Sequence, residues 1–390
     1  MKGDKKQFCL GKIHFPTLQL SMATELMILI VCAGLQLCYY LFFFARLNLV
    51  RGYNGVPSHL PPASIIICAK NEAKNLAQNL KVVMIQQYPQ FEVIVVNDQS
   101  TDNTLDVLID YYRRNPTMKL VNIPPDAKKE YAGKKHALLK GIEVATFDHI
   151  VVTDADCRPQ TTYWLAKLVG AYMSDTKVVL GHSPYEKGKG FLNSLIRYEN
   201  YMTALQYFGF AKAGIPYMGV GRNMSYKKEV LQGFKGFDTN KDMATGDDDL
   251  LINAVANGRN TEVCIDKDAF MVTKPATTFG DWLNQKRRHM RSGFKYKFHH
   301  QLLLLVFALS NLLFYSTFLF LLIQAVHWQL AVAVFCITLL LKWLLTARVF
   351  NKLGVADLKW TQPVLDVLYV NYLVVIFFLL LLKPKDNWRT

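Results

Sequence analysis

Carboxylates and one amide stand directly after three short apolar runs in the first half of the sequence. They are Asn71 and Glu72 after residues 63–69, Asp98 after residues 92–97, and Asp154 and Asp156 after residues 149–153. Two carboxylates at positions i and i+2 are well placed to bind a hard divalent cation, which can bridge a diphosphate and neutralise a leaving group. An isolated D-x-D is more often a solvated turn. The matching acids after the two other runs favour a binding site here.

The elements that must position these acids alternate along the chain. Runs rich in β-branched residues predict strands at 63–69, 92–97, 120–123 and 149–153, and helical patterns cover 75–87 and 135–145. This alternation predicts a parallel α/β sheet whose ligands bind beyond the carboxyl ends of the strands. The acids should therefore converge at one edge. The sequence contains neither G-x-G-x-x-G nor G-x-x-x-x-G-K-[ST], so it has no dinucleotide fingerprint and no phosphate loop.

Several motifs occur in the order found in one known family. They are I-I-I-C-A-K-N-E at 65–72, V-V-N-D-Q-S-T-D-N-T at 95–104, G-K-x-x-A-L at 133–138, D-A-D at 154–156 and Q-K-R-R-H at 285–289. The chain resembles the inverting family 2 glycosyltransferases of GT-A fold, especially the membrane-embedded polysaccharide synthases and lipid glycosyltransferases. The resemblance covers residues 63 to about 293. It implies transfer of a sugar from a nucleotide-sugar donor, UDP being the expected nucleotide, to a lipid or growing glycan.

The resemblance also implies the residues of the donor site. They are Asn71, Glu72, Asp98, Lys134, Asp154, Asp156, Gln285 and Arg288. Glu72 and Asp98 would hold the nucleobase, while Lys134 and Arg288 would face the diphosphate. Asp154 and Asp156 would bind Mg²⁺ or Mn²⁺ as the cofactor.

On the acceptor side the resemblance implies a glycine-rich turn and a histidine. They are Gly221, Arg222 and Asn223, and His289, which stands where the family motif Q-x-x-R-W has tryptophan. An imidazole keeps a flat face but adds a titratable nitrogen, so its role is left open.

The segment T-G-D-D-D-L-L-I-N at 245–253 resembles the one that supplies the general base in this family. Inversion by direct displacement needs one carboxylate to take the proton of the acceptor hydroxyl. Aligned on Gly246, that base is Asp248, with Asp247 next in line and Asp249 third. Three adjacent acids could instead form a second cation site or the start of a helix, where negative charge is favourable.

Four nearly charge-free runs of about 20 residues are long enough to cross the bilayer. The expected organisation is a tail at 1–23, transmembrane helices at 24–47, 302–326, 328–347 and 364–382, and a GT-A-like domain at 55–293 between the first and second helix. Lys342 and Asp366 lie inside apolar runs near expected helix ends, where snorkelling of the side chains would explain them. A functional role is the alternative.

Lysine and arginine near these runs indicate the orientation. Basic residues crowd residues 286–297 and 348–359, whereas the hinge around His327 has none, so the large domain is expected on the cytoplasmic side of the cell membrane. Two segments disagree with this orientation. The N-terminal Lys2, Lys5, Lys6 and Lys12 and the C-terminal Lys383, Lys385 and Arg389 would both lie outside. A start at Met22 would remove the first conflict but not the second.

The net charge of +15 could also suggest a nucleic-acid partner. We expect none, because the lysines are dispersed and the acids cluster where a phosphate backbone would have to approach. We expect the basic residues near the apolar runs to contact anionic membrane lipid instead. A second alternative is a non-catalytic membrane scaffold or partner subunit of a polysaccharide export system. Such a protein would be expected to lose at least one acidic position, and this chain retains them all.

Overall fold

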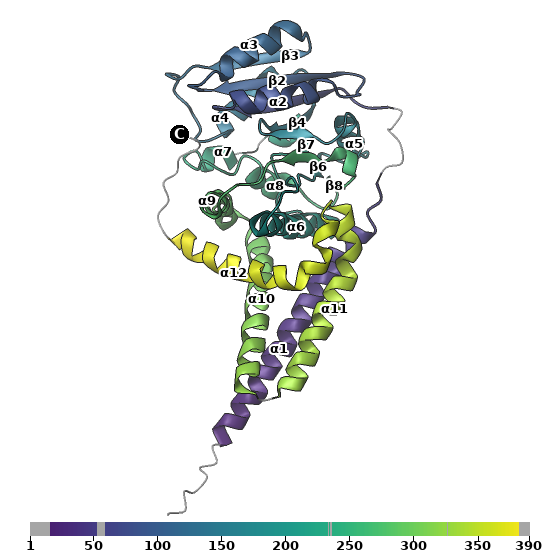
Figure 1. Cartoon of the computed structure of the whole chain (residues 1–390). Coiled ribbons are helices and arrows are strands. Elements are labelled where there is room, and N and C mark those ends of the chain that lie inside the picture. Colours follow the sequence, from purple (N-terminus) through teal and green to yellow (C-terminus); the bar gives the residue numbers. More distant parts are fainter. Residues whose placement is uncertain (1–15, 53–58, 233, 235, 326, 382–390) are drawn as a thin grey trace, which may run out of the picture.

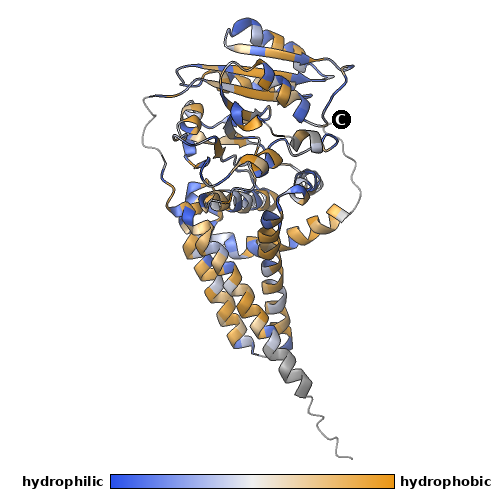
Figure 2. Ribbon diagram, turned by 180° about the vertical axis from the view of Figure 1, so that it is seen from behind, coloured by the Kyte–Doolittle hydropathy of each residue, from blue (hydrophilic) through white to orange (hydrophobic). Residues whose placement is uncertain are grey.

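A computed structural model of the chain describes residues 16–52, 59–232, 234, 236–325 and 327–381. A layered α/β domain stands above a bundle of long apolar helices, and the last helix runs between the two (Figure 1). Colouring by hydropathy shows orange residues along most of the long helices and in the strands, whereas the other helices and the loops of the domain carry many blue residues (Figure 2).

Within the described residues the main sheet has seven strands in the order β3-β2-β1-β4-β7-β6-β8. The strands of this sheet are β1 Ala63–Ala69, β2 Phe91–Asp98, β3 Met118–Ile123, β4 His149–Asp154, β6 Val178–Gly181, β7 Met224–Lys227 and β8 Thr261–Cys264, and β5 Cys157–Pro159 pairs with β9 Met271–Thr273 in a small second sheet. β1 is parallel to β2 and β4, and β2 to β3, as the sequence predicts. β7 runs antiparallel to β4 and β6.

Helices cover both faces of this sheet. The α-helices of the domain are α2 Ala73–Met84, α3 Thr104–Arg114, α4 Lys135–Val144, α5 Trp164–Val169, α6 Phe191–Lys212, α7 Gly236–Thr239, α8 Asp249–Val255 and α9 Phe279–Met290, and its 3₁₀ turns are η2 Lys228–Leu231, η3 Lys267–Ala269 and η4 Ser292–Lys295. Alternate residues of β1 pack to opposite sides: Ile65 lies in a core with α2, α3 and α5, and Ile66 in a core with α4 and α6. Strands buried on both faces are continuously apolar, which is why the first strands could be read from sequence.

The direction of β7 determines which loops share the edge of the sheet. Met224, the first residue of β7, pairs with Val152 near the end of β4. The glycine-rich turn before β7 therefore lies at the same edge as Asp154, which closes β4. One antiparallel strand thus brings a segment from the second half of the domain to the acids of the first half.

Four helical segments of the described chain are long and apolar enough to cross a membrane. The long helices and the 3₁₀ turns that adjoin them are α1 Pro16–Phe42, η1 Phe44–Asn48, α10 Phe298–Gln324, α11 Trp328–Lys352, η5 Ala356–Thr361 and α12 Gln362–Leu381. α1 begins inside the segment expected as a tail, whose residues 1–15 lie outside the described part. α1, α10 and α11 lie side by side, whereas α12 runs across their domain-side ends in both views (Figures 1 and 2).

The expected snorkelling of Lys342 and Asp366 is wrong. Both side chains are fully buried, and Lys342 Nζ lies 3.3 Å from Asp366 Oδ2. Asp366 also accepts hydrogen bonds from the hydroxyls of Tyr198 on α6, at 2.7 Å, and Tyr315 on α10, at 3.0 Å. The pair therefore joins α11, α12, α10 and the globular domain at one point. Sequence spacing could not reveal it, because the partners come from four separate elements.

We predict that Asp366→Asn destabilises the protein strongly, because it leaves the buried Lys342 ammonium without a countercharge. Removing one partner of a buried ion pair typically costs about 3–5 kcal/mol. The double variant Lys342→Met/Asp366→Asn should recover most of this loss, since no charge is then buried. The measurement is the thermal unfolding midpoint in lipid nanodiscs.

Lys140→Met serves as the matched control, because it breaks a surface pair with Glu143, and exposed pairs contribute about 0–1 kcal/mol. An Asp366→Asn variant as stable as this control would show that the buried pair does not hold α12 in place.

Candidate active site

A cavity of about 410 Å³ opens at the carboxyl edge of the sheet and continues to the apolar helices. Its sheet end is lined by Glu72, Lys134, Asp154 and Asp156, which follow β1 and β4 or precede α4. Its far end is lined by side chains of α6, α10 and α12. The cavity therefore connects the acids predicted for the donor site with the part of the molecule expected at the membrane.

Lys134 and Asp154 form the charged centre of the sheet end. Lys134 Nζ lies 2.5 Å from Asp154 Oδ1 and 4.0 Å from Asp247 Oδ2. Burial alone would raise the pKa of Asp154, but the Lys134 ammonium outweighs it and holds the pKa below its ordinary value. The loop approaches closely because Gly133 has φ +68°, and a Cβ there would lie 2.1 Å from the carbonyl oxygen of Ala244.

Asp156 differs electrostatically from its neighbour. Burial, reinforced by the nearby Asp154 charge, raises the pKa of Asp156. A bound cation would relieve the repulsion between the Asp154 and Asp156 carboxylates and so stabilise the ionised form of Asp156. One ligand atom each from Asp154, Asp156 and Cys157 lie within 4.8 Å of one another, and two carboxylate oxygens suit Mg²⁺ or Mn²⁺. The residues present therefore fit the predicted divalent ion.

The three consecutive aspartates have different surroundings. Asp249 is saturated: its carboxylate accepts hydrogen bonds from the Ser292 hydroxyl, from Tyr296 Oη at 2.7 Å and from the Leu250 amide at 2.8 Å. It ties α8 to the turn that leads into α10. Asp247 faces Lys134 at the sheet end of the cavity.

Asp248 lies between these two, against the glycine-rich turn. Its Oδ2 accepts a hydrogen bond from the Gly221 amide at 2.6 Å, and Oδ1 accepts one from the Asp249 amide at 2.8 Å. A Cβ at Gly221 would lie 3.1 Å from Oδ2, so glycine keeps the contact open. Burial and the negative charge of Asp249 raise the pKa of Asp248 to about 6. A carboxyl with a pKa near the working pH is suited to accept a proton.

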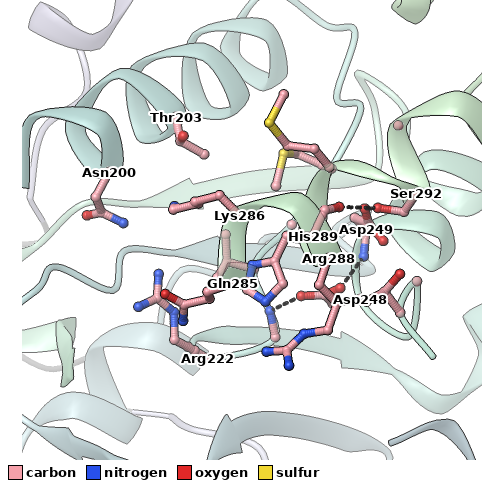
Figure 3. A pocket seen from close by; sticks show the side chains of 18 of the residues that line it. Asn200, Thr203, Arg222, Asp248, Asp249, Gln285, Lys286, Arg288, His289 and Ser292 are labelled. Atoms are coloured by element: carbon pink, nitrogen blue, oxygen red, sulfur yellow. Dashed lines mark hydrogen bonds between the residues drawn. The ribbon is translucent and has the colours of Figure 1, made fainter. Parts of the chain in front are cut away.

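Helix α9 supplies the basic wall of the cavity. Gln285, Arg288 and His289 all line it, and they converge on the same space as Arg222 and Asp248 (Figure 3). The Thr278 hydroxyl accepts a hydrogen bond from the Asp281 amide at 3.1 Å and caps the helix. Desolvation within the cavity, with the Lys286 and Arg288 charges, lowers the pKa of His289 to about 3, although its side chain is exposed to the cavity. The guanidinium carbon of Arg222 lies over the Tyr185 ring, 4.7 Å from the ring centroid.

Three sequence-predicted residues do not line this cavity. The side chain of Asn223 is buried away from the cavity, where it bonds Trp164 Nε1 at 2.9 Å and the carbonyls of His182 and Ala269. Asp98 is fully buried and pairs with Lys129 Nζ at 2.6 Å. Asn71 uses its side-chain oxygen to accept from the Thr101 amide at 2.8 Å. Asp98 and Asn71 thus brace the loops beside the cavity in this conformation.

Sequence reasoning also missed a polar stripe on α6. Asn200, Thr203 and Gln206 follow one another at i, i+3 and i+6 and line the cavity opposite α9 (Figure 3). Next to them Glu199 forms a salt bridge with Lys286 of α9. The sequence did contain a signal for these residues, because they form a polar stripe in a segment that is otherwise rich in aromatic residues. Buried polar side chains need hydrogen-bond partners or ligands.

Comparisons with known proteins agree with this geometry. Residues 64–234 match the family described as "Glycosyl transferase family 2". The probable glycosyltransferase YdaM of Bacillus subtilis is 32% identical over 211 residues, which are 51% of this chain and 47% of that protein. The poly-beta-1,6-N-acetyl-D-glucosamine synthase of Staphylococcus epidermidis is 30% identical over 122 residues, 30% of this chain and 27% of the synthase. The matches thus span about half or less of these relatives.

The fold is shared more widely than the sequence. The mannosyltransferase PcManGT from Pyrobaculum calidifontis, solved in complex with GDP-Man and Mn²⁺, superposes with a TM-score of 0.62 at 19% identity. The match covers 93% of this chain and 99% of that one, so it includes the long helices. The GT-A-like fold with flanking apolar helices is thereby confirmed. Residues 64–234 of this chain are therefore a glycosyl transferase family 2 domain.

Proposed function

We propose that this protein is an integral-membrane enzyme that transfers a sugar, with inversion, from a nucleotide-sugar to a hydroxyl of a lipid or growing glycan. The observation that carries the proposal is that Asp154 and Asp156 line the same cavity as side chains of α10 and α12. Residues 55–293 would form the catalytic domain. The basic residues near α9 and the start of α10 favour the cytoplasmic side for it.

The donor would lie with its diphosphate at the sheet end. Asp154 and Asp156 would hold Mg²⁺ or Mn²⁺, which when bound supplies positive charge for the diphosphate and the leaving group. Lys134, Arg222 and Arg288 stand around the same space and add positive charge from the protein side. Glu72 would contact the nucleoside. Asp98 would do so only after Lys129 is displaced from its carboxylate.

The chemical step needs a base on the acceptor side of the sugar. The acceptor oxygen forms a bond to the anomeric carbon, the bond from that carbon to the phosphate oxygen breaks, and the acceptor proton passes to Asp248. The nucleoside diphosphate leaves with the bonding electron pair. Asp248 is assigned this role because Asp249 is saturated by Ser292 and Tyr296, while Asp247 faces Lys134. Asp247 would support the charge of its neighbour.

The acceptor would enter from the far end, between α6 and α9. The Lys286 charge is balanced by Glu199, and Asn200, Thr203 and Gln206, which also line this end, carry neutral side chains. The three aspartates at the junction would repel an anionic nucleophile. A neutral hydroxyl therefore suits the site better than a lipid phosphate, and only a hydroxyl needs a base. The apolar lining from α10 and α12 favours a lipid-linked acceptor.

We predict that Asp156→Asn weakens the binding of UDP or GDP in the presence of Mn²⁺ by roughly tenfold or more, about 1.4 kcal/mol, because one cation ligand is lost. Titration calorimetry with and without EDTA measures this. Asp110→Asn, a change at an exposed surface pair with Arg114, is the control. Affinity that neither EDTA nor Asp156→Asn alters would argue against a metal-dependent donor site.

Asp248→Asn should reduce transfer by ~10²- to 10⁴-fold, the usual effect of losing a positioned base. Nucleotide affinity should change by no more than about threefold, since a nearly isosteric amide keeps the shape of the site. Asp249→Asn should reduce activity less, and mainly through stability. The assay follows sugar transfer into lipid from radiolabelled donors. Full activity of Asp248→Asn with an inactive Asp247→Asn would move the base by one residue.

The raised pKa of Asp248 predicts the pH dependence. A carboxyl with a pKa of about 6 is protonated at pH 5, where an ordinary aspartate is ionised, so transfer should fall as the pH drops through about 6 and stay flat above it. Asp249→Asn removes a negative charge that raises this pKa and should shift the midpoint to lower pH. A profile of kcat against pH that is level down to pH 5 would contradict the assignment.

A further inference from the structure

Helix α12 does not share the direction of the other long helices. α1, α10 and α11 pack along one another, with Gln36 Nε2 donating to the Ser310 carbonyl at 3.0 Å and Tyr39 Oη to that of Leu303 at 2.7 Å. α12 instead crosses their domain-side ends and extends beneath the globular domain in both views (Figures 1 and 2). By length and composition alone, α12 is a candidate membrane span. Its axis, however, does not run parallel to those of the three other candidates.

One face of α12 is covered by the protein between Leu365 and Ile376. Asp366 bonds to Tyr198 of α6, and Gln206 of α6 donates to Tyr369 Oη at 3.2 Å. Further along, the Tyr372 ring stacks on Trp282 of α9 with centroids 4.7 Å apart, and Ile376 is fully buried. These contacts hold α12 against α6 and α9, which belong to the globular domain.

The opposite face of α12 is an exposed stripe at helical spacing. Val364, Val367, Val375 and Phe378 are exposed, by 38–64%, and Asn371 is the polar exception on the same side. An exposed apolar stripe of this length normally marks a contact with lipid or another protein. α12 packs against α10, whose own outer residues, such as Leu305 and Leu309, are also apolar and exposed, and this indicates lipid.

The level at which α12 crosses the bundle fits a membrane boundary. Beyond Ala308, which lines the cavity with Leu373 of α12, α10 continues to Gln324 for about 24 Å at 1.5 Å per residue. From Lys342, which pairs with Asp366, α11 extends back to Trp328 for about 21 Å. In-plane helices lie ~5–10 Å inside the boundary of a hydrocarbon core ~30 Å thick. The two lengths agree with this depth.

We infer that α12 lies in the plane of the membrane, in the leaflet on the domain side, with its Val364–Val367–Val375–Phe378 stripe against the acyl chains. The chain then crosses the bilayer three times, through α1, α10 and α11. The buried Lys342–Asp366 pair anchors the start of α12 in this position. This inference does not depend on the proposed reaction.

The three-crossing arrangement removes one conflict in the sequence. With α12 in the membrane plane, the sequence no longer requires Lys383, Lys385 and Arg389 to be assigned to the outside, which basic residues disfavour. It also places the far end of the cavity, between α10 and α12, beside the lipid of that leaflet. An acceptor could then reach Asp248 laterally from the bilayer.

The depth of spin labels in nanodiscs tests this directly. Single cysteines are placed at Val364, Val367, Val375 and Phe378, in a background with Cys9, Cys38 and Cys336 replaced by serine, and relaxation by oxygen and a nickel chelate reports depth. The matched set of label sites on α10 consists of the exposed residues Leu305, Leu309, Leu313 and Leu319. Each set of four sites covers about 21 Å of helix. Far-UV circular dichroism and the unfolding midpoint verify that each variant is folded.

The α12 labels should all report one shallow depth within a few ångströms, while the α10 labels descend steadily into the core. Two results would overturn the inference. A depth gradient along α12 equal to that of α10 would make it a membrane span. Labels on α12 reached by nickel as freely as by oxygen at all four sites would place the stripe in water or against a protein.

Discussion

The hydrogen-bonded carboxylate of Asp249 holds together two parts of the molecule that face different solvents. It accepts from Ser292 and Tyr296, which precede α10, while its own backbone begins α8 beside the sheet edge. Asn253 of α8 extends this link by donating to the Tyr217 carbonyl at 2.7 Å and contacting His300 Nδ1 at 2.9 Å. These bonds help to fix the position of the aspartates relative to the long apolar helices.

The electrostatics of the cavity follow from this arrangement. Acids from β4 and from the 247–249 segment surround Lys134, so cations and anions alternate from the sheet edge to α9. Burial makes each charge depend on its neighbours, and these charges fit the proposed metal ion and diphosphate. Toward the membrane end the charges of Lys286 and Glu199 balance each other. The lining thus becomes less charged toward the end at which we propose that the acceptor binds.

Sequence could predict the parts of the structure that depend on local patterns. The run at 63–69 is β1 with the expected bounds, and the acids after β1 and β4 reach one cavity because parallel strands end at a common edge. It could not show that Asn223 bonds Trp164, or that Lys342 meets Asp366, because those partners are far apart in the chain. The direction of α12 was equally hidden, since a helix apolar on every side looks the same whether it crosses a membrane or lies along it.

The stereochemistry of the product tests the central claim, that one carboxylate activates the acceptor for direct displacement across this cavity. The lipid product made from a donor of known anomeric configuration is purified and its anomeric centre assigned by NMR. A single displacement with Asp248 as base requires inversion, so an α-linked donor should give a β-linked product. Retention of configuration would contradict this mechanism, because retention by two displacements needs an enzyme nucleophile in addition to the base.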